Sequence, residues 1–225
     1  MLLVGNGRLI TRDEAFPYAE DGAVALDGEV IKEVGALSEL RAKYPDAEFV
    51  DARGGVIMPG LINVHTHIYS GLARGLSIDG FNPTNFLEVL DGQWWYIDRH
   101  LTLDGTRACA YATVLDSIRD GVTTIFDHHA SFCEIPGSLF AIKDVCQELG
   151  IRANLCYEVS ERDGAEKCGQ AIRENADFAK WAREQDDDMI RAMFGGHALF
   201  TLSDRTFARM VEANNGMTGF HIHVA

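Results

Sequence analysis

The sequence lacks any run close to the roughly 20 apolar residues of a membrane-spanning helix, which argues against an integral membrane protein. Its opening residues, MLLVGNGRLITRDE, turn polar too early for a secretory signal peptide. No internal repeat and no low-complexity tract are found, so a repeat solenoid or a disordered linker is not expected.

Disulfide-type cysteine patterns and an excess of basic residues are also missing. The cysteine count is odd and no C-x-x-C occurs, which is typical of reduced thiols in a cytoplasmic protein. There are 20 Lys and Arg against 34 Asp and Glu, giving a formal net charge of −14. This balance argues against nucleic acid or an anionic membrane as partner and leaves a small-molecule substrate open.

The 225 residues contain 47% hydrophobic residues, enough for one large domain or two small ones. Residues 1–56 read as short strands with polar turns, including a hairpin whose turn is Asp27-Gly28 and a helical stretch over 38–44 capped by Ser38. A short strand is expected over 48–51. Because so few strands do not close a core unaided, this β module needs either the next domain or strands from elsewhere.

Residues 57–225 alternate between buried strands and helices, which indicates a parallel sheet with right-handed crossovers. A long loop is predicted over 68–102, and the acidic residues 186–188 are interpreted as a solvated loop. The predicted strands are 61–67, 122–127, 151–159, 189–195 and 217–224. The predicted helices are 103–120, 137–149 and 165–184, with another that begins after Ser203 or Asp204 as N-cap.

The first of these strands ends in His65 and His67, whose side chains point to the same face with Cα atoms roughly 6.5 Å apart. That spacing lets both imidazoles bind one metal ion. A lone H-x-H is a weak signal, but all the histidines except His100 follow apolar, β-prone runs. These are His65, His67, His128, His129, His197, His221 and His223. Such strand ends converge in a (β/α)8 barrel, whereas in an open sheet they would span roughly 19 Å.

Four segments contain these histidines: PGLINVHTH at 59–67, GVTTIFDHH at 121–129, GGHALFTLSD at 195–204 and FHIHVA at 220–225. Together they resemble the amidohydrolase superfamily in its cytosine-deaminase and chlorohydrolase branch. The resemblance implies an α/β fold: the N-terminal part of a (β/α)8 TIM barrel, with about five strands. A small β-sandwich-type module precedes it and normally needs the C-terminus for completion.

The resemblance also implies a metal centre formed by His65, His67 and His223, with His221 as a weaker candidate. One divalent ion is expected, zinc first and iron second, because strand four has neither the lysine nor the glutamate that bridges two ions in binuclear members. His197 corresponds to a histidine that contacts substrate. His128 and Trp95 are further candidates for the substrate pocket.

No catalytic residue is assigned, because the glutamate of the family's H-x-x-E motif would follow Ala225. The strand-six histidine and the strand-eight aspartate are missing too. We therefore expect an N-terminal portion of a longer enzyme, as a truncated product or a fragment. We expect it to be inactive unless another chain completes it, and we expect the full-length form to be a homodimer.

The predicted reaction is hydrolysis of a carbon–nitrogen bond by a metal-activated water, with a heterocyclic or amidine-like substrate. A cyclic-amide hydrolase or a chlorohydrolase is the alternative within enzymes. A non-catalytic scaffold or an inactive fragment is the alternative outside them, against which the aligned histidines argue.

Several roles stay open at this point. His128 and His129 either line the pocket or form hydrogen bonds in the loop. Trp94 and Trp95 either wall an aromatic site or simply pack. Glu158, at the end of strand three, either faces the site or does not. Asp127 is expected to cap the next turn rather than bind metal.

Overall fold

The computed structural model describes residues 1–185 and 187–224, which fall into two compact units, Met1–Gly60 and Leu61–Ala225. Each unit is described by itself. Asp186, part of the predicted acidic loop, lies outside the described residues, whereas Asp187 and Asp188 are exposed. Within the described part of the chain, no helix has both the length and the apolar character needed to cross a membrane.

The first unit is a five-stranded sheet with one short helix. Its strands β1, β2 and β3 are antiparallel, and β4 and β5 run parallel to β1 on its other side. Their bounds are β1 Leu2–Ile10, β2 Tyr18–Asp27, β3 Val30–Ala36, β4 Glu48–Asp51 and β5 Val56–Ile57. The predicted hairpin is confirmed, with Gly28 at φ +61° between β2 and β3, a conformation that favours glycine.

The helix of this unit, α1 (Leu37–Lys43), covers a small core of Leu3, Ala23, Ala25 and Leu40. The prediction that Ser38 caps it is wrong. The helix begins one residue earlier, and its N-cap residue, Ala36, offers no side-chain hydrogen bond. Packing of Leu40 against the sheet therefore replaces capping as the reason that this helix forms here.

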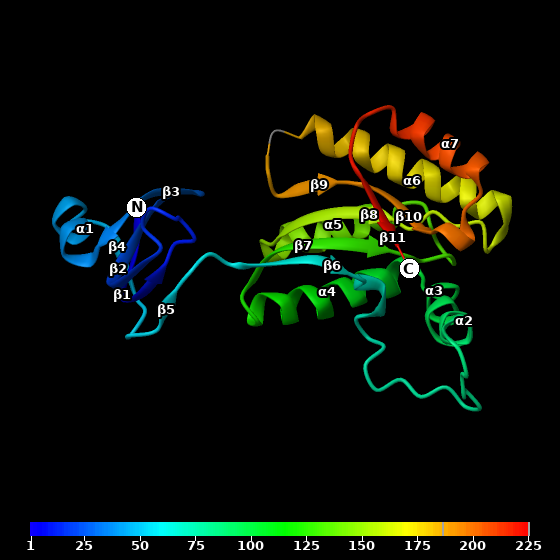
Figure 1. The fold of residues 1–225 in the computed structure, drawn as a ribbon, viewed down its shortest axis with the longest axis horizontal. Coiled ribbons are helices and arrows are strands. Elements are labelled where there is room, and N and C mark those ends of the chain that lie inside the picture. The colour runs from blue at the N-terminus through cyan, green and yellow to red at the C-terminus, as the bar shows by residue number, and fades with distance from the viewer. Residues whose placement is uncertain (186, 225) are drawn as a thin grey trace. The chain divides into compact units, whose positions relative to one another are not determined.

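The second unit alternates strands and helices, as predicted, and every strand pair in it is parallel (Figure 1). The strands are β6 Leu61–Thr66, β7 Val122–His129, β8 Arg152–Tyr157, β9 Ile190–Ala192, β10 Phe194–Ala198 and β11 Phe220–His223. The main helices are α4 Leu103–Arg119, α5 Ser138–Leu149, α6 Gly164–Glu184 and α7 Asp204–Asn214.

The predicted fourth strand is broken into β9 and β10 at Met193. β9 pairs with β8, whereas β10 pairs with β11 and is joined to the segment after β8 by a bridge between Val159 and Gly196. At Gly195 a Cβ atom would collide with the carbonyl of Tyr157, so glycine permits this close passage of two backbones. The order of strand positions is that of the first five positions of a (β/α)8 barrel.

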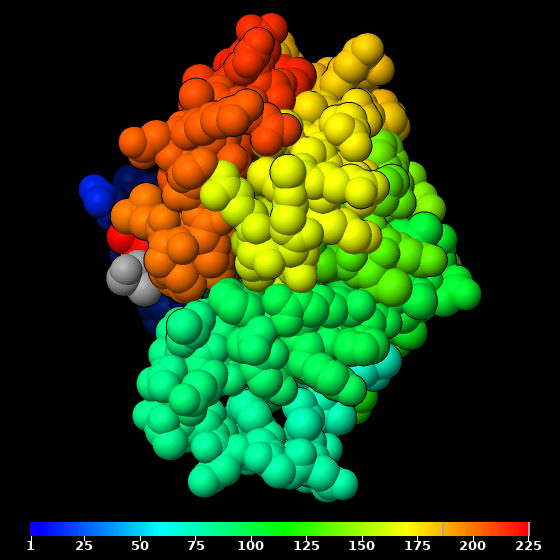
Figure 2. Space-filling model, turned by 90° about the vertical axis from the view of Figure 1, so that its right-hand side faces the viewer, coloured from blue at the N-terminus to red at the C-terminus, as the bar shows by residue number. Residues whose placement is uncertain are grey.

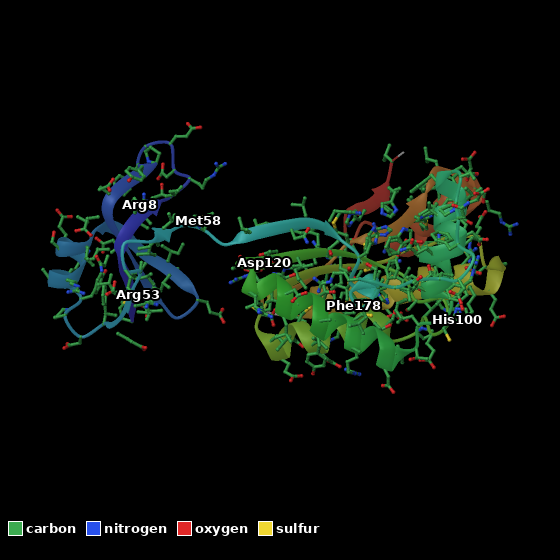
Figure 3. The ribbon with its side chains drawn as sticks, turned by 90° about the horizontal axis from the view of Figure 1, so that it is seen from below. Arg8, Arg53, Met58, His100, Asp120 and Phe178 are labelled. Carbon is green, nitrogen blue, oxygen red and sulfur yellow. The ribbon has the colours of Figure 1, made fainter. Side chains whose placement is uncertain are left out.

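Local sequence signals begin and end the helices. The Thr102 side chain accepts a hydrogen bond from Gly105 N at the start of α4, and Ser203 caps α7 by accepting from Thr206 N. Gly150 ends α5 in the left-handed conformation. The helices cover the sheet with fully buried side chains such as Phe178 of α6, which lies inside the packed second unit (Figure 3). His100 is exposed, as predicted.

The segment between β6 and α4 corrects the prediction of a plain loop. It contains a 3-10 turn, Ile68–Ser70, and then three consecutive helical pieces: α2 (Phe86–Val89), a π-helical turn (Leu90–Trp94) and α3 (Trp95–Asp98). Asn85 caps this stretch by accepting a hydrogen bond from Glu88 N at 3.0 Å. Figure 2 shows the segment as a lobe at the bottom of that view. Its helical pieces are too short for a periodic pattern to reveal them.

The parallel strands of the second unit curl strongly. β6 and β11 occupy the first and last of the five positions, roughly 19 Å apart if the sheet were flat. The imidazole Nε2 atoms of His65 on β6 and His223 on β11 nevertheless lie 3.3 Å apart. The sheet therefore bends like a barrel wall, and the carboxyl ends of its outer strands meet.

Candidate metal centre and adjoining cavity

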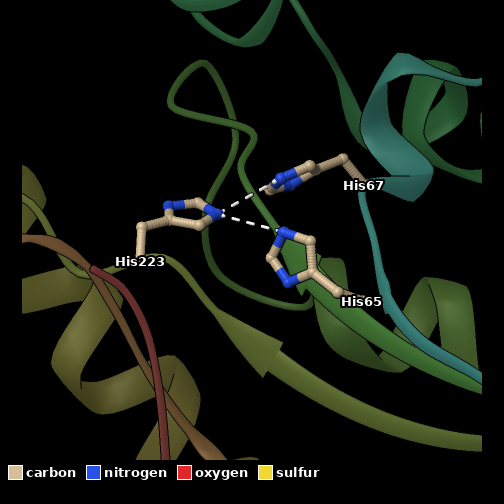
Figure 4. A group of neighbouring side chains, drawn as sticks. All are labelled: His65, His67 and His223. Carbon is tan, nitrogen blue, oxygen red and sulfur yellow. Dashed lines mark hydrogen bonds between the residues drawn. The ribbon is translucent and has the colours of Figure 1, made fainter. Parts of the chain in front are cut away.

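Three imidazoles converge at the carboxyl ends of β6 and β11 (Figure 4). Nε2 of His223 lies 3.3 Å from Nε2 of His65 and 3.3 Å from Nε2 of His67. Tetrahedral coordination with metal–nitrogen bonds of about 2.0–2.1 Å requires ligand atoms roughly 3.3–3.4 Å apart. The three residues named from the sequence are thus brought together with the spacing of metal ligands.

The hydrogen bonds behind these rings suit metal binding. Nδ1 of His67 lies 2.8 Å from the carbonyl oxygen of His128, which only accepts, so Nδ1 carries the proton and Nε2 keeps its lone pair. Burial lowers the pKa of His67 to about 4 and that of His223 to about 3. Both rings are neutral at pH 7, the state in which imidazole binds a metal.

His221, the weaker candidate from the sequence, lies beside the three rings rather than among them. Its Nε2 is 2.9 Å from Nδ1 of His65, and its Nδ1 is 3.8 Å from Sγ of Cys156. By accepting a hydrogen bond from Nδ1–H of His65, His221 fixes the ring of His65 with Nε2 turned toward His223. His221 is therefore placed to orient a ligand.

His128 lies behind the three rings and is fully buried. Its Nε2 is 3.0 Å from the carbonyl oxygen of Gly196 and 3.2 Å from that of His221, and its Nδ1 faces Glu158 at 3.6 Å. It is not part of the cavity wall described below. This position suits a residue that supports the wall, and direct contact between His128 and substrate stays a prediction.

Asp127 and His129 lie deeper still. Asp127 Oδ1 accepts a hydrogen bond from Ile68 N at 2.7 Å, so this carboxyl holds the turn that follows His67. This hydrogen bond holds the turn after β6, so the predicted capping of the turn after Asp127 itself is not seen among the described residues. Neither ring nitrogen of His129 has a hydrogen-bond partner among the described residues, and burial lowers the pKa of this histidine to about 3.

A cavity of about 340 Å³ opens beside the metal centre and reaches His67 and His223. Five aromatic side chains line it, from Tyr69, Phe86, Trp94, Trp95 and Phe200, with Ser70, Glu158 and His197 as further polar members. Two of the predicted substrate-binding residues, Trp95 and His197, are thus on the wall, and their ring centroids lie 5.9 Å apart. An apolar cavity with a few converging polar groups is typical of a small-molecule site.

Arg162 and Asp98 form a buried ion pair under this wall that the sequence reasoning did not find. Two nitrogens of Arg162 donate to the Asp98 carboxylate at 2.6 and 3.2 Å, and one of them lies 3.4 Å from Glu158 Oε1. The guanidinium also lies over the ring of Trp95, 4.9 Å from its centroid. The sequence feature that could have indicated this pair is the E-x-x-x-R spacing of Glu158 and Arg162, just after a predicted buried strand.

The Glu158 carboxyl is ionised in this setting. Burial raises its pKa, but the closeness of His128, His197 and Arg162 lowers it to about 2. The side chain is almost fully buried and is a member of the cavity wall, so it meets whatever fills the cavity.

Comparison with known proteins agrees with this architecture. The family model described as "Amidohydrolase family" matches residues 56–225, and a bacterial imidazolonepropionase-like composite domain matches residues 22–47. The chain belongs to the amidohydrolase family. It is 29% identical over 224 residues to a 5'-deoxyadenosine deaminase of Methanosarcina barkeri, covering 99% of this chain and 48% of the relative. It is also 31% identical over 204 residues to a 5-methylthioadenosine/S-adenosylhomocysteine deaminase of Thermococcus onnurineus, covering 90% and 44%.

Solved structures show the same fold. Atrazine chlorohydrolase TrzN from Arthrobacter aurescens TC1, complexed with zinc, superposes with a TM-score of 0.79 at 22% identity, over 99% of this chain and 52% of that one. Guanine deaminase from E. coli superposes with a TM-score of 0.78 at 17% identity, over 99% and 53%. The predicted α/β fold is confirmed. The chain spans about half the length of the curated relatives it matches.

Proposed function

We propose that this chain provides the metal-binding part of a metal-dependent hydrolase of carbon–nitrogen bonds, an aminohydrolase of a heterocyclic or amidine-like substrate. The observation that carries the proposal is the pair of 3.3 Å separations joining Nε2 of His223 to Nε2 of His65 and His67. Deaminases among the relatives that match nearly the whole chain support it.

In this proposal His65, His67 and His223 hold one divalent ion, with zinc preferred and iron second. A bound divalent ion supplies a water activated as a nucleophile at neutral pH. A single ion is favoured because β9 and β10 contain no lysine or glutamate that would bridge a second one. The zinc bound by the structurally similar chlorohydrolase supports the choice of metal.

The other residues of the site orient the metal ligands or contact the substrate. His221 orients His65, and the carbonyl of His128 orients His67. Trp95 and His197 are proposed to contact the substrate in the cavity, and the aromatic wall excludes water from it. We assign no general base within the chain.

Hydrolysis of a carbon–chlorine bond is the second candidate. The fold likeness to atrazine chlorohydrolase TrzN favours it, because that structure superposes on 99% of this chain. A chloro-heterocycle and an amino-heterocycle present the same kind of planar ring, so both suit an aromatic-walled cavity of this size. The product distinguishes the two reactions, because the chlorohydrolase reaction releases chloride and the aminohydrolase reaction releases ammonia.

The remaining parts of the proposal concern organisation. We propose that residues 1–56 form a composite β module, completed by segments beyond this chain, and that residues 57–225 form the first half of the barrel. The match of residues 22–47 to a composite-domain model supports the first part. The five cysteines, all free, are compatible with a cytoplasmic protein. A homodimer stays a prediction.

Metal analysis tests the proposal directly. Purified chain dialysed against zinc is expected to retain about one equivalent, which His65→Ala and His67→Ala lose while His100→Ala keeps it. Ammonia release from amino-heterocycles is then assayed with the zinc-loaded protein, as this chain and as any longer form of it. Wild-type zinc content in His65→Ala would refute the ligand assignment.

A further inference from the structure

We propose that the cavity beside the metal centre selects a planar heterocycle by an edge that carries two adjacent hydrogen-bond donors, an amino group next to a ring N–H. Glu158 and His197 accept those two hydrogen bonds. The proposal rests on the proposed function, because it names the substrate class of the same site.

Glu158 is fixed in place and has acceptor capacity left. Its backbone N–H donates to the His129 carbonyl at 2.7 Å, which anchors the residue at the end of β8. Among the described residues, the contacts of its carboxylate are all long: 3.4 Å to Arg162, 3.6 Å to His128 and 3.9 Å to His197. A carboxylate has about four acceptor positions, so short hydrogen bonds to a ligand are available.

The charge of Glu158 is not cancelled by its nearest cation. Arg162 makes its two shorter bonds to Asp98, at 2.6 and 3.2 Å, so its guanidinium is largely committed to that carboxylate. Among the described residues that line the cavity, Glu158 is the one carboxylate, and neither lysine nor arginine is present. The wall therefore favours donor groups on the ligand over acceptors.

His197 is held as a second acceptor. Thr201 Oγ1 donates its hydrogen to the Ala198 carbonyl at 3.1 Å, so toward Nδ1 of His197, 2.7 Å away, it accepts. Nδ1 of His197 therefore carries the proton, and Nε2 presents a lone pair to the cavity side. The hydrogen-bond network thus sets the tautomer of a wall residue.

Nε2 of His197 and Oε1 of Glu158 lie 3.9 Å apart. Two acceptors at this distance do not satisfy each other, so both can accept hydrogen bonds from donors on a ligand. An amino group beside a ring N–H offers two donors on one edge of a planar molecule. Aromatic side chains in the cavity wall suit the faces of such a ring, and the Arg162 guanidinium over Trp95 helps to fix one of them in place.

The test uses two neutral single-ring probes that differ by one donor. Isocytosine has the amino group beside a ring N–H, whereas 4-pyrimidinone lacks the amino group. Binding of each to the zinc-loaded chain is measured by calorimetry for the wild type, Glu158→Gln and the control Glu161→Gln. Glu161 is three residues away and bonds to Ser203 and Thr206 rather than lining this cavity, so its variant removes the same charge from the same loop.

We expect the wild type and Glu161→Gln to bind isocytosine about tenfold more tightly than 4-pyrimidinone, the ratio expected of one charge-assisted hydrogen bond. In Glu158→Gln, whose amide has one acceptor and adds a donor, the ratio falls below about threefold. Equal binding of the two probes by the wild type would overturn the proposal without any variant. An unchanged ratio in Glu158→Gln would overturn the role of Glu158.

Two controls keep these outcomes separate from other failures. Thermal unfolding of each variant shows whether it is folded, and Glu158→Asp serves as a second variant, expected to keep part of the preference because the charge remains. Zinc content is measured on the same samples. Zinc bound without probe preference overturns this inference alone, whereas preference without bound zinc contradicts the proposed function and supports this inference.

Discussion

Nδ1 of His65 and Nε2 of His221 lie 2.9 Å apart although 156 positions separate the two residues in the sequence. The contact joins β6 to β11, the first and last strand positions of the curled sheet. The ring of His221 on β11 therefore positions the ring of His65 on β6, at the opposite end of the strand order. Side chains that orient a ligand in this way tune its affinity for metal without touching the ion.

Replacing His221 is expected to weaken metal binding without abolishing it. His221→Ala should lower zinc affinity about 10- to 100-fold, because His65 loses the acceptor that fixes its tautomer and ring direction. Competition with a chromogenic chelator measures the change. His100→Ala, which removes an exposed imidazole, should leave affinity unchanged. Complete loss of zinc in His221→Ala would instead make His221 a direct ligand.

Acid should destabilise the metal-free chain. Burial lowers the pKa of His129 to about 3 from an ordinary 6.5, so between these values the unfolded chain binds more protons than the folded one. Stability then rises with pH in this window and is lost as pH falls through it. From pH 7 to pH 5 the free energy of unfolding should drop by about 2 kcal/mol for each such histidine.

Denaturant unfolding in the presence of a chelator measures this dependence. His129→Leu removes one buried imidazole, so its loss of stability between pH 7 and pH 5 should be smaller by about 2 kcal/mol. His100→Leu serves as the matched control and should show the wild-type dependence, because that residue is exposed. The same pH dependence in His129→Leu and wild type would contradict the assignment of a neutral, buried His129.

Asn175 of α6 should be a strong determinant of stability. Its Oδ1 accepts from the backbone N–H groups of Tyr157 and Gly195 at 2.9 and 3.0 Å, and its Nδ2 donates to the Tyr157 carbonyl at 2.7 Å. It thus joins β8 to β10 where the direct ladder between them is interrupted. Asn175→Ala should cost about 2–4 kcal/mol, because buried backbone groups lose their partners.

Lys180→Ala, an exposed change on the same helix, should cost less than about 0.5 kcal/mol in the same denaturant titration. Asn175→Asp keeps the acceptor but not the donor and should fall between the two. A cost for Asn175→Ala as small as that of Lys180→Ala would mean that water replaces the amide at this junction.

The buried ion pair of Arg162 and Asp98 should contribute strongly to the stability of the fold next to the cavity. Arg162→Met leaves Asp98 buried without its cation, so we expect a loss of about 3–5 kcal/mol in unfolding free energy. Arg99→Met is the control, because Arg99 is partly exposed and its ion pairs should contribute about 1 kcal/mol or less. Adding Asp98→Asn to Arg162→Met should recover part of the loss, and no recovery would show that Asp98 is not the charge left unpaired.

Much of the fold is predictable from local pattern. The Asp27-Gly28 turn, the helices after Thr102 and Ser203, and the parallel strands of the second unit follow from turn residues, caps and apolar runs. The exceptions are short or interrupted elements. The helical pieces over 86–98 are too brief to show a period, and the break at Met193 arises from the close passage of Gly195 past Tyr157.

The site divides in the same way. Alternation along a strand places His65 and His67 on one face, and this was decided by the sequence alone, because side-chain direction in a strand is a local property. The tertiary structure alone decided three other features of the site. It determined which nitrogen of each ring is free, and it placed His221 behind His65. It also placed Arg162 between Asp98 and Glu158. These depend on the curl that brings β6 to β11, a sum of packing contacts between residues far apart in the chain, which no local pattern encodes.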